Sequence, residues 1–150
     1  MNTRLCYNST DRRYEVRTNQ RVLSTHPNRQ DALLAQLGSE APEVVELART
    51  LIAAHPVLTD RALKAVTLAS EGAVQATDKP LRYRVRSQQK RKGKLALVYT
   101  VDLAQSSCTC PDWVQGAPTV NGRTVCKHVL AALFIRKLST APCEAVEVTP

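Results

Sequence analysis

The chain has 150 residues, which is enough for one domain or for two small ones that share a core. Apolar residues make up 43% and aromatic residues only 4%, so the core must consist mostly of leucine, valine and alanine. Lysines and arginines outnumber acids by 21 to 13, and the resulting charge of +8 favours a polyanionic partner, with nucleic acid as the first candidate, over a merely soluble surface.

The start of the chain is polar and charged, unlike a secretory signal, and no apolar run approaches the roughly 20 residues that span a bilayer. We therefore expect a cytoplasmic protein without a membrane segment. In a reducing compartment, the five cysteines favour metal ligands over disulfides.

Residues 1–11 are predicted to be a flexible N-terminus, followed over residues 12–76 by a hairpin and helices. The hairpin is expected to pair residues 12–16 with 21–24, because Asn19 in the intervening turn tolerates a positive φ.

Three amphipathic helices are predicted over residues 28–38, 42–55 and 59–72. Asn28 has the character of an N-cap, and Pro42 is favourable in the first turn of a helix. We interpret these helices as a supporting bundle.

After a polar joint at residues 77–80, the hydrophobic period changes from 3.6 to 2. Residues 81–87 alternate basic and apolar side chains, residues 88–94 form a charged turn, and residues 95–103 are a strong strand candidate. A β-hairpin with a long basic tip is the expected structure.

The last helix is predicted over residues 125–138, and residues 139–150 are expected to be a disordered tail. The fold class is therefore α+β: a helical N-terminal region with a short β-hairpin, followed over residues 77–138 by a ββα module.

Four candidate metal ligands lie at the two ends of the loop between the second strand and the last helix: Cys108, Cys110, Cys126 and His128. Residues i and i+2 can aim their side chains at one point both in an extended turn and at a helix N-terminus. Three thiolates and one imidazole suit a closed tetrahedral site with one structural Zn²⁺. The alternatives are unliganded cysteines, a redox dithiol and a catalytic zinc, but four protein ligands leave no open position for water.

The ligand pattern C-x-C…C-x-H, with Pro111, Asp112 and Lys127 at subsidiary positions, resembles the SWIM zinc finger in its bacterial form. The resemblance covers roughly residues 60–138 and leaves the first 58 without a counterpart. It implies a ββα zinc module that binds DNA or protein, similar to modules in Mutator-class transposases, SWI2/SNF2-type bacterial ATPases and recombination mediators.

A second candidate site is the basic hairpin, because period-2 geometry places Arg82, Arg84 and Arg86 on one face of a strand. The candidate nucleic-acid contacts are these three arginines and the four charges of the hairpin tip, Lys90, Arg91, Lys92 and Lys94. Guanidiniums about 7 Å apart along a strand can follow phosphates, whereas a purely solvated face would usually mix signs.

Neither a Walker-type glycine loop nor the signature of a zinc deaminase is present, and we expect no enzymatic activity and no small-molecule substrate. The predicted function is a zinc-stabilised nucleic-acid-binding accessory protein, weakly sequence-specific, that acts with a larger ATPase, recombinase, transposase or defence system. DNA is favoured over RNA as the partner. The alternative is a protein–protein interaction adaptor whose zinc module docks a partner.

Overall fold

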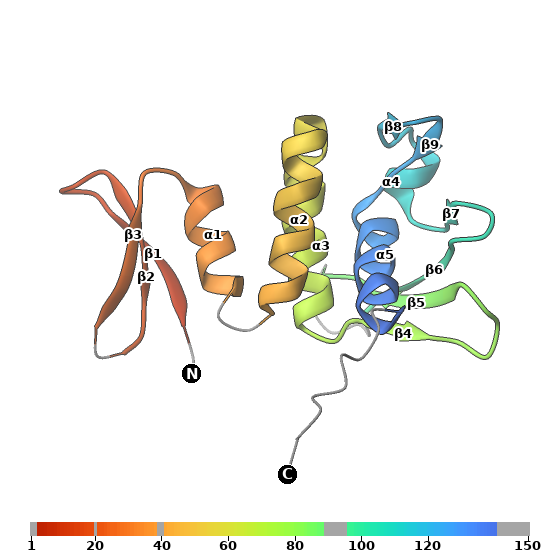
Figure 1. The fold of residues 1–150 in the computed structure, drawn as a ribbon, viewed down its shortest axis with the longest axis horizontal. Coiled ribbons are helices and arrows are strands. Elements are labelled where there is room, and N and C mark those ends of the chain that lie inside the picture. Colours follow the sequence, from red (N-terminus) through yellow and green to blue (C-terminus); the bar gives the residue numbers. More distant parts are fainter. Residues whose placement is uncertain (1–2, 20, 39–40, 89–95, 141–150) are drawn as a thin grey trace, which may run out of the picture.

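A computed structural model describes residues 3–19, 21–38, 41–88 and 96–140. The architecture is α+β, as predicted, with an N-terminal sheet, a central layer of helices and a second sheet beside the last helix (Figure 1). In the part of the chain described, no helix is long and apolar enough to cross a membrane.

The N-terminal sheet has three antiparallel strands in the order β1-β2-β3. The hairpin of β2 (Arg13–Arg17) and β3 (Val22–His26) agrees with the prediction. The N-terminal segment expected to be flexible instead contains β1 (Arg4–Asn8), which pairs along the whole of β2. Its sequence gives only a weak strand signal, and pairing with β2 satisfies its backbone groups.

Three helices follow the sheet: α1 (Arg29–Gly38), α2 (Pro42–Ala54) and, after the short 3₁₀ turn η1 (Pro56–Leu58), α3 (Thr59–Ser70). The predicted N-cap is present, because the Asp31 amide donates to Asn28 Oδ1 over 2.9 Å. Thr59 is the first residue of α3, and its hydroxyl donates to the carbonyl of Pro56. Gly72 ends this segment with a φ of 63°.

The second sheet has four antiparallel strands in the order β4-β5-β6-β7, two more than the predicted hairpin. The hairpin strands are β5 (Arg82–Arg86) and β6 (Val98–Asp102). The added strands are β4 (Val74–Ala76) and β7 (Ser107–Cys108), too short to be recognised without their partners. Because β4 pairs with β5, the boundary expected between residues 76 and 77 falls between two paired strands.

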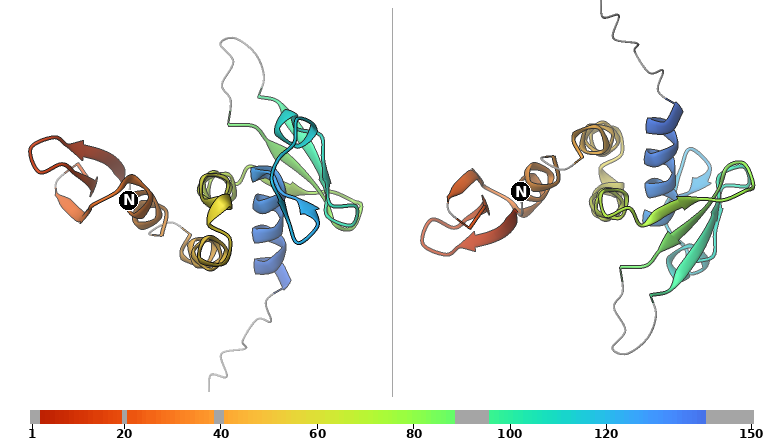
Figure 2. Two further views of the ribbon diagram at one scale, coloured as in Figure 1. Left: turned by 90° about the horizontal axis from the view of Figure 1, so that it is seen from above. Right: turned by 90° about the horizontal axis from the view of Figure 1, so that it is seen from below.

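The last helix, α5 (Lys127–Thr140), begins two residues later than predicted and extends to Thr140, so the first two residues of the expected tail are helical. Residues 141–150 of that tail lie outside the described residues. Helix α5 packs against α3, and both views in Figure 2 place it between the helical layer and the second sheet. A single cluster of buried side chains runs from Leu34 of α1 to Phe134 of α5.

The loop between the two halves of the candidate metal site is itself folded. It contains α4 (Pro111–Val114) and a hairpin of β8 (Thr119–Val120) and β9 (Arg123–Thr124). Asn121 and Gly122 have φ values of 51° and 74°, as a tight hairpin turn of opposite hand to type I requires. This turn brings the chain back to α5.

Candidate metal centre

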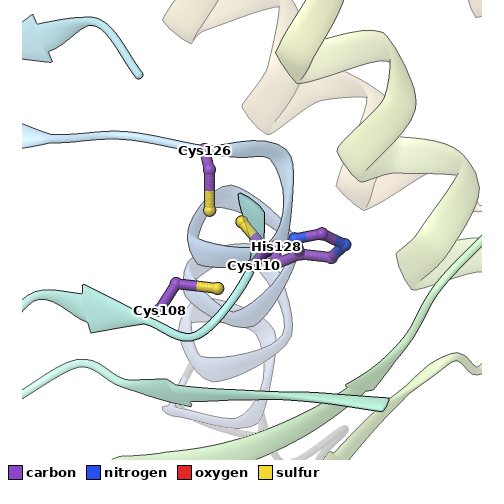
Figure 3. A group of neighbouring side chains, drawn as sticks. All are labelled: Cys108, Cys110, Cys126 and His128. Carbon is purple, nitrogen blue, oxygen red and sulfur yellow. The ribbon is translucent and has the colours of Figure 1, made fainter. Parts of the chain in front are cut away.

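The four predicted ligands come from two turns that face each other. Cys108 is the last residue of β7, and Cys110 follows it as the N-cap of α4. Cys126 precedes α5, and His128 lies in the first turn of that helix. The three sulfur atoms gather beside the imidazole of His128 (Figure 3).

The geometry of these side chains fits one Zn²⁺ ion. Their ligand atoms all lie within 4.8 Å of one another. Tetrahedral zinc, with Zn–S of about 2.3 Å and Zn–N of about 2.0 Å, sets its ligand atoms roughly 3.5–3.8 Å apart. All four residues are at most 5% exposed, so the site is closed by protein on every side. A closed set of four ligands is typical of a structural zinc site.

His128 supplies an independent sign that a cation belongs here. Both of its ring nitrogens are buried, and neither has a hydrogen-bond partner among the described residues. A buried polar atom without a partner costs about 1–3 kcal/mol, and coordination to a metal removes that cost for one nitrogen. The ring lies against Tyr99 of β6, with centroids 4.8 Å apart, so the sheet holds the imidazole in place.

The pKa values of the thiols also indicate that this site binds a cation. Contact with Cys110 raises the pKa of Cys108 far above the ordinary range of a thiol, and the same contact lowers the pKa of Cys110. Three adjacent sulfur atoms cannot all ionise without a positive charge between them. A divalent cation supplies that charge and displaces the thiol protons. The backbone amide of Trp113 donates to Cys110 Sγ over 3.4 Å and further favours the thiolate.

Residues 99–137 match the SWIM zinc finger. The match contains all four ligands and confirms the resemblance seen in the sequence, although it begins later than the expected residue 60. No curated protein and no solved structure gives a significant match to the chain. The SWIM segment is thus a zinc-binding module for nucleic-acid or protein interaction.

An ion pair links the SWIM segment to a helix outside the match. Arg61 of α3 donates through Nε and Nη2 to the two carboxylate oxygens of Asp112, over 3.2 and 2.8 Å. The hydrogen bond to Asp112 raises the pKa of Arg61. In the sequence, Asp112 was singled out only as a subsidiary position of the SWIM pattern. Its partner lies 51 residues away, and no local signal could identify it.

The strand of the second candidate site has the predicted alternation of basic and apolar residues. Along β5, Tyr83 and Val85 are buried, whereas Arg84 and Arg86 are exposed on the opposite face. Arg82 shares their face but is not free, because its Nη2 lies 2.8 Å from Asp102 Oδ2 on β6. This contact also lowers the pKa of Asp102. Among the described residues, Arg84 and Arg86 make no ion pair.

The other candidate contacts of the basic hairpin lie at its tip. Lys90, Arg91, Lys92 and Lys94 lie outside the described residues. Leu97 lies within the predicted strand 95–103 but is 37% exposed, because it precedes β6 and the sheet does not cover it. Trp113 is half-buried against the core beside the metal ligand Cys110, in keeping with a hydrophobic lid on the site.

Proposed function

We propose that this protein is a zinc-stabilised nucleic-acid-binding accessory protein, and that Arg84 and Arg86 contact phosphates. The observation that carries the proposal is the open face of β5. Two adjacent guanidiniums on that face make no ion pair with any described residue, about 7 Å apart along the strand. The register neighbours of Arg84 are Gln75 on β4 and Thr100 on β6, and that of Arg86 is Val98 on β6. All three neighbours are uncharged and exposed.

Zinc has a structural role in this proposal. The ion would join the end of β7 to the start of α5, and α5 packs under the sheet that presents the arginines. Zinc bound by four protein ligands has no position for a substrate, which supports a function in binding rather than catalysis. The larger system is inferred to be a cytoplasmic ATPase, recombinase, transposase or defence assembly, in keeping with the resemblance.

Phosphate contacts predict weak sequence specificity. Guanidiniums on the face of a sheet can pair with phosphates of any sequence, and the release of counterions then dominates affinity. DNA is the proposed partner.

A charge-matched pair of variants tests the proposal by fluorescence anisotropy. The zinc-loaded protein is titrated with labelled duplex and single-stranded DNA and RNA at several salt concentrations. Replacing Arg84 and Arg86 by Gln should weaken binding about tenfold or more and lower the slope of log K against log salt by about 2. The control replaces two exposed basic residues on helices, Arg49 and Lys137, by Gln, and removes the same charge.

If both variants bound nucleic acid equally weakly, the loss of affinity would follow from net charge alone. That result would contradict a specific role for β5. Absence of binding by the parent protein at low salt would overturn the proposal as a whole.

A second candidate function, a protein-interaction adaptor, rests on an apolar groove between α2 and α5. The groove has a volume of about 520 Å³, and its wall includes Leu51, Leu133 and Phe134. Leu133 of α5 is 39% exposed. An apolar interface would give binding that depends little on salt, so the same titration with a protein partner separates the two functions.

A further inference from the structure

The N-terminal sheet, which has no counterpart in the SWIM match, has two chemically different faces. Strand register places Leu5 opposite Val16 on one face, and Val16 is only 2% exposed. The other face carries the alternate residues of β1 and β2. Its register pairs are Arg4 with Arg17, Cys6 with Glu15, and Asn8 with Arg13.

Helix α1 covers the apolar face. It contacts all three strands and packs most closely on the central strand β2, as a helix lying across a face does. Figures 1 and 2 show α1 between the sheet and α2, with the far side of the sheet at the end of the molecule. On the opposite face Arg4, Arg13 and Arg17 are exposed, whereas Glu15 between them is only 8% exposed. We call these three residues the N-terminal arginine face.

The charges on this face oppose the stability of the sheet. Arg4 and Arg17 stand directly opposite each other on adjacent strands, and like charges in that position destabilise a sheet. Glu15 relieves part of the repulsion, because its Oε2 lies 3.5 Å from Arg17 Nε. Arg4 and Arg13 make no ion pair with any described residue.

The two acids of this region, Asp11 and Glu15, already accept hydrogen bonds from a neighbouring side chain. Asn8 Nδ2 donates to Asp11 over 3.1 Å and to Glu15 over 2.8 Å. Residues 3–26 contain five arginines, no lysine and only these two acids. A surface kept only for solubility usually mixes both signs. The pair of Arg4 and Arg17 lowers the stability of the sheet. Binding of a polyanion to this face would explain why the chain carries such a pair.

We propose that the N-terminal arginine face binds the phosphate backbone of duplex DNA. The proposal extends beyond the contacts of Arg84 and Arg86, because it uses a different sheet and does not require them. The major groove of B-DNA is about 12 Å wide and admits a two-stranded β-ribbon, such as the pair β1 and β2 that carries the three arginines, whereas that of an RNA duplex is too narrow and deep.

Single-stranded nucleic acid fits this face less well than a duplex. Single strands are held largely by stacking of bases on aromatic side chains. The two tyrosines of the sheet, Tyr7 and Tyr14, stack on each other with centroids 5.0 Å apart and lie on the face of Val16. The arginine face itself contains no aromatic residue among the strand positions paired by register.

Fluorescence anisotropy with the full zinc-loaded chain tests the proposal. The variant Arg4→Gln/Arg13→Gln leaves the Arg17–Glu15 contact intact and should weaken binding to a short DNA duplex about tenfold. The slope of log K against log salt should fall by about 2. Arg49→Gln/Lys137→Gln is the control of equal charge, and an RNA duplex and a single strand of the same sequence are the comparison ligands. Equal affinity of the variant and the control for duplex DNA would overturn the proposal.

A parallel measurement avoids dependence on the folding of the variant. Addition of duplex DNA to the parent protein should shift the amide resonances of β1 and β2 in NMR spectra, and unchanged resonances there would contradict the proposal. The Arg84→Gln/Arg86→Gln variant is titrated alongside. Loss of affinity only in that variant would support the β5 site and refute the N-terminal one, and loss only in the Arg4/Arg13 variant would do the reverse.

Discussion

At the scale of single residues, much of the stability of the SWIM segment depends on the four metal ligands. The core around them is made largely of small side chains, and Cys126 is fully buried at the start of α5. A structural zinc site contributes about 10 kcal/mol or more to folding, comparable with the whole stability of an ordinary domain. Removal of one ligand therefore leaves a buried site whose remaining thiols have no adequate cation.

The substitution Cys126→Ser should abolish stoichiometric zinc binding and unfold the region around α5. Zinc content by atomic absorption and thermal melting by circular dichroism measure the two effects. Cys6→Ser is the matched control, because Cys6 lies on β1, half-buried and outside the ligand set. Its zinc content should equal that of the parent protein. A Cys126→Ser protein with full zinc content and an unchanged melting curve would refute the structural site.

At the scale of elements, the hairpin of β5 and β6 combines a structural arginine with two that are open to solvent. Arg82 and Asp102 are register partners, and the other oxygen of Asp102 accepts the amides of Ala104 and Gln105 in the turn after β6. The carboxylate thus joins β5, β6 and the turn that leads to β7. Arg84 makes no comparable contact among the described residues. We therefore assign Arg82 a structural role and Arg84 a role in binding.

Single substitutions should separate these roles. Arg82→Gln removes a partly exposed ion pair worth about 0.2–1 kcal/mol, so the melting temperature should fall by up to about 2–4 °C. Arg84→Gln should leave the melting temperature nearly unchanged but weaken nucleic-acid binding. Melting curves and anisotropy titrations of both proteins check the prediction. The opposite pattern, with Arg84 affecting only stability, would show that the roles had been assigned incorrectly.

The same elements show what the sequence could predict. Local signals identified the three helices after the first hairpin and the strands of the basic hairpin, since periodicity, Asn28 and Pro42 act within a few residues. The metal ligands were predictable because their chemistry requires close spacing. Strands β1 and β4 were missed because their neighbours in the sheet decide their structure. The Arg61–Asp112 pair depends on how α3 packs against the SWIM segment, which periodicity does not determine.

At the scale of the whole molecule, the SWIM segment and the helices before it share one core. Ala62, Ala65 and Val66 of α3 are fully buried in the same cluster as Val129 and Leu130 of α5. The Arg61–Asp112 pair adds a second link between α3 and the metal-binding loop. By contrast, Val16 and Ala32, the buried residues between the N-terminal sheet and α1, lie outside that cluster.

Zinc removal should therefore destabilise α3 together with α5, and not the residues of the SWIM match alone. Hydrogen exchange measured by mass spectrometry, before and after addition of a chelator, can follow each helix separately. We expect protection to fall in parallel in α3 and α5, because the buried alanines of α3 lose the surface on which they pack. The strands of the N-terminal sheet should lose less protection, since their buried contacts lie apart from that surface. If α3 kept its full protection while α5 exchanged freely, the two would be independent modules, and the role of zinc would be confined to the SWIM segment.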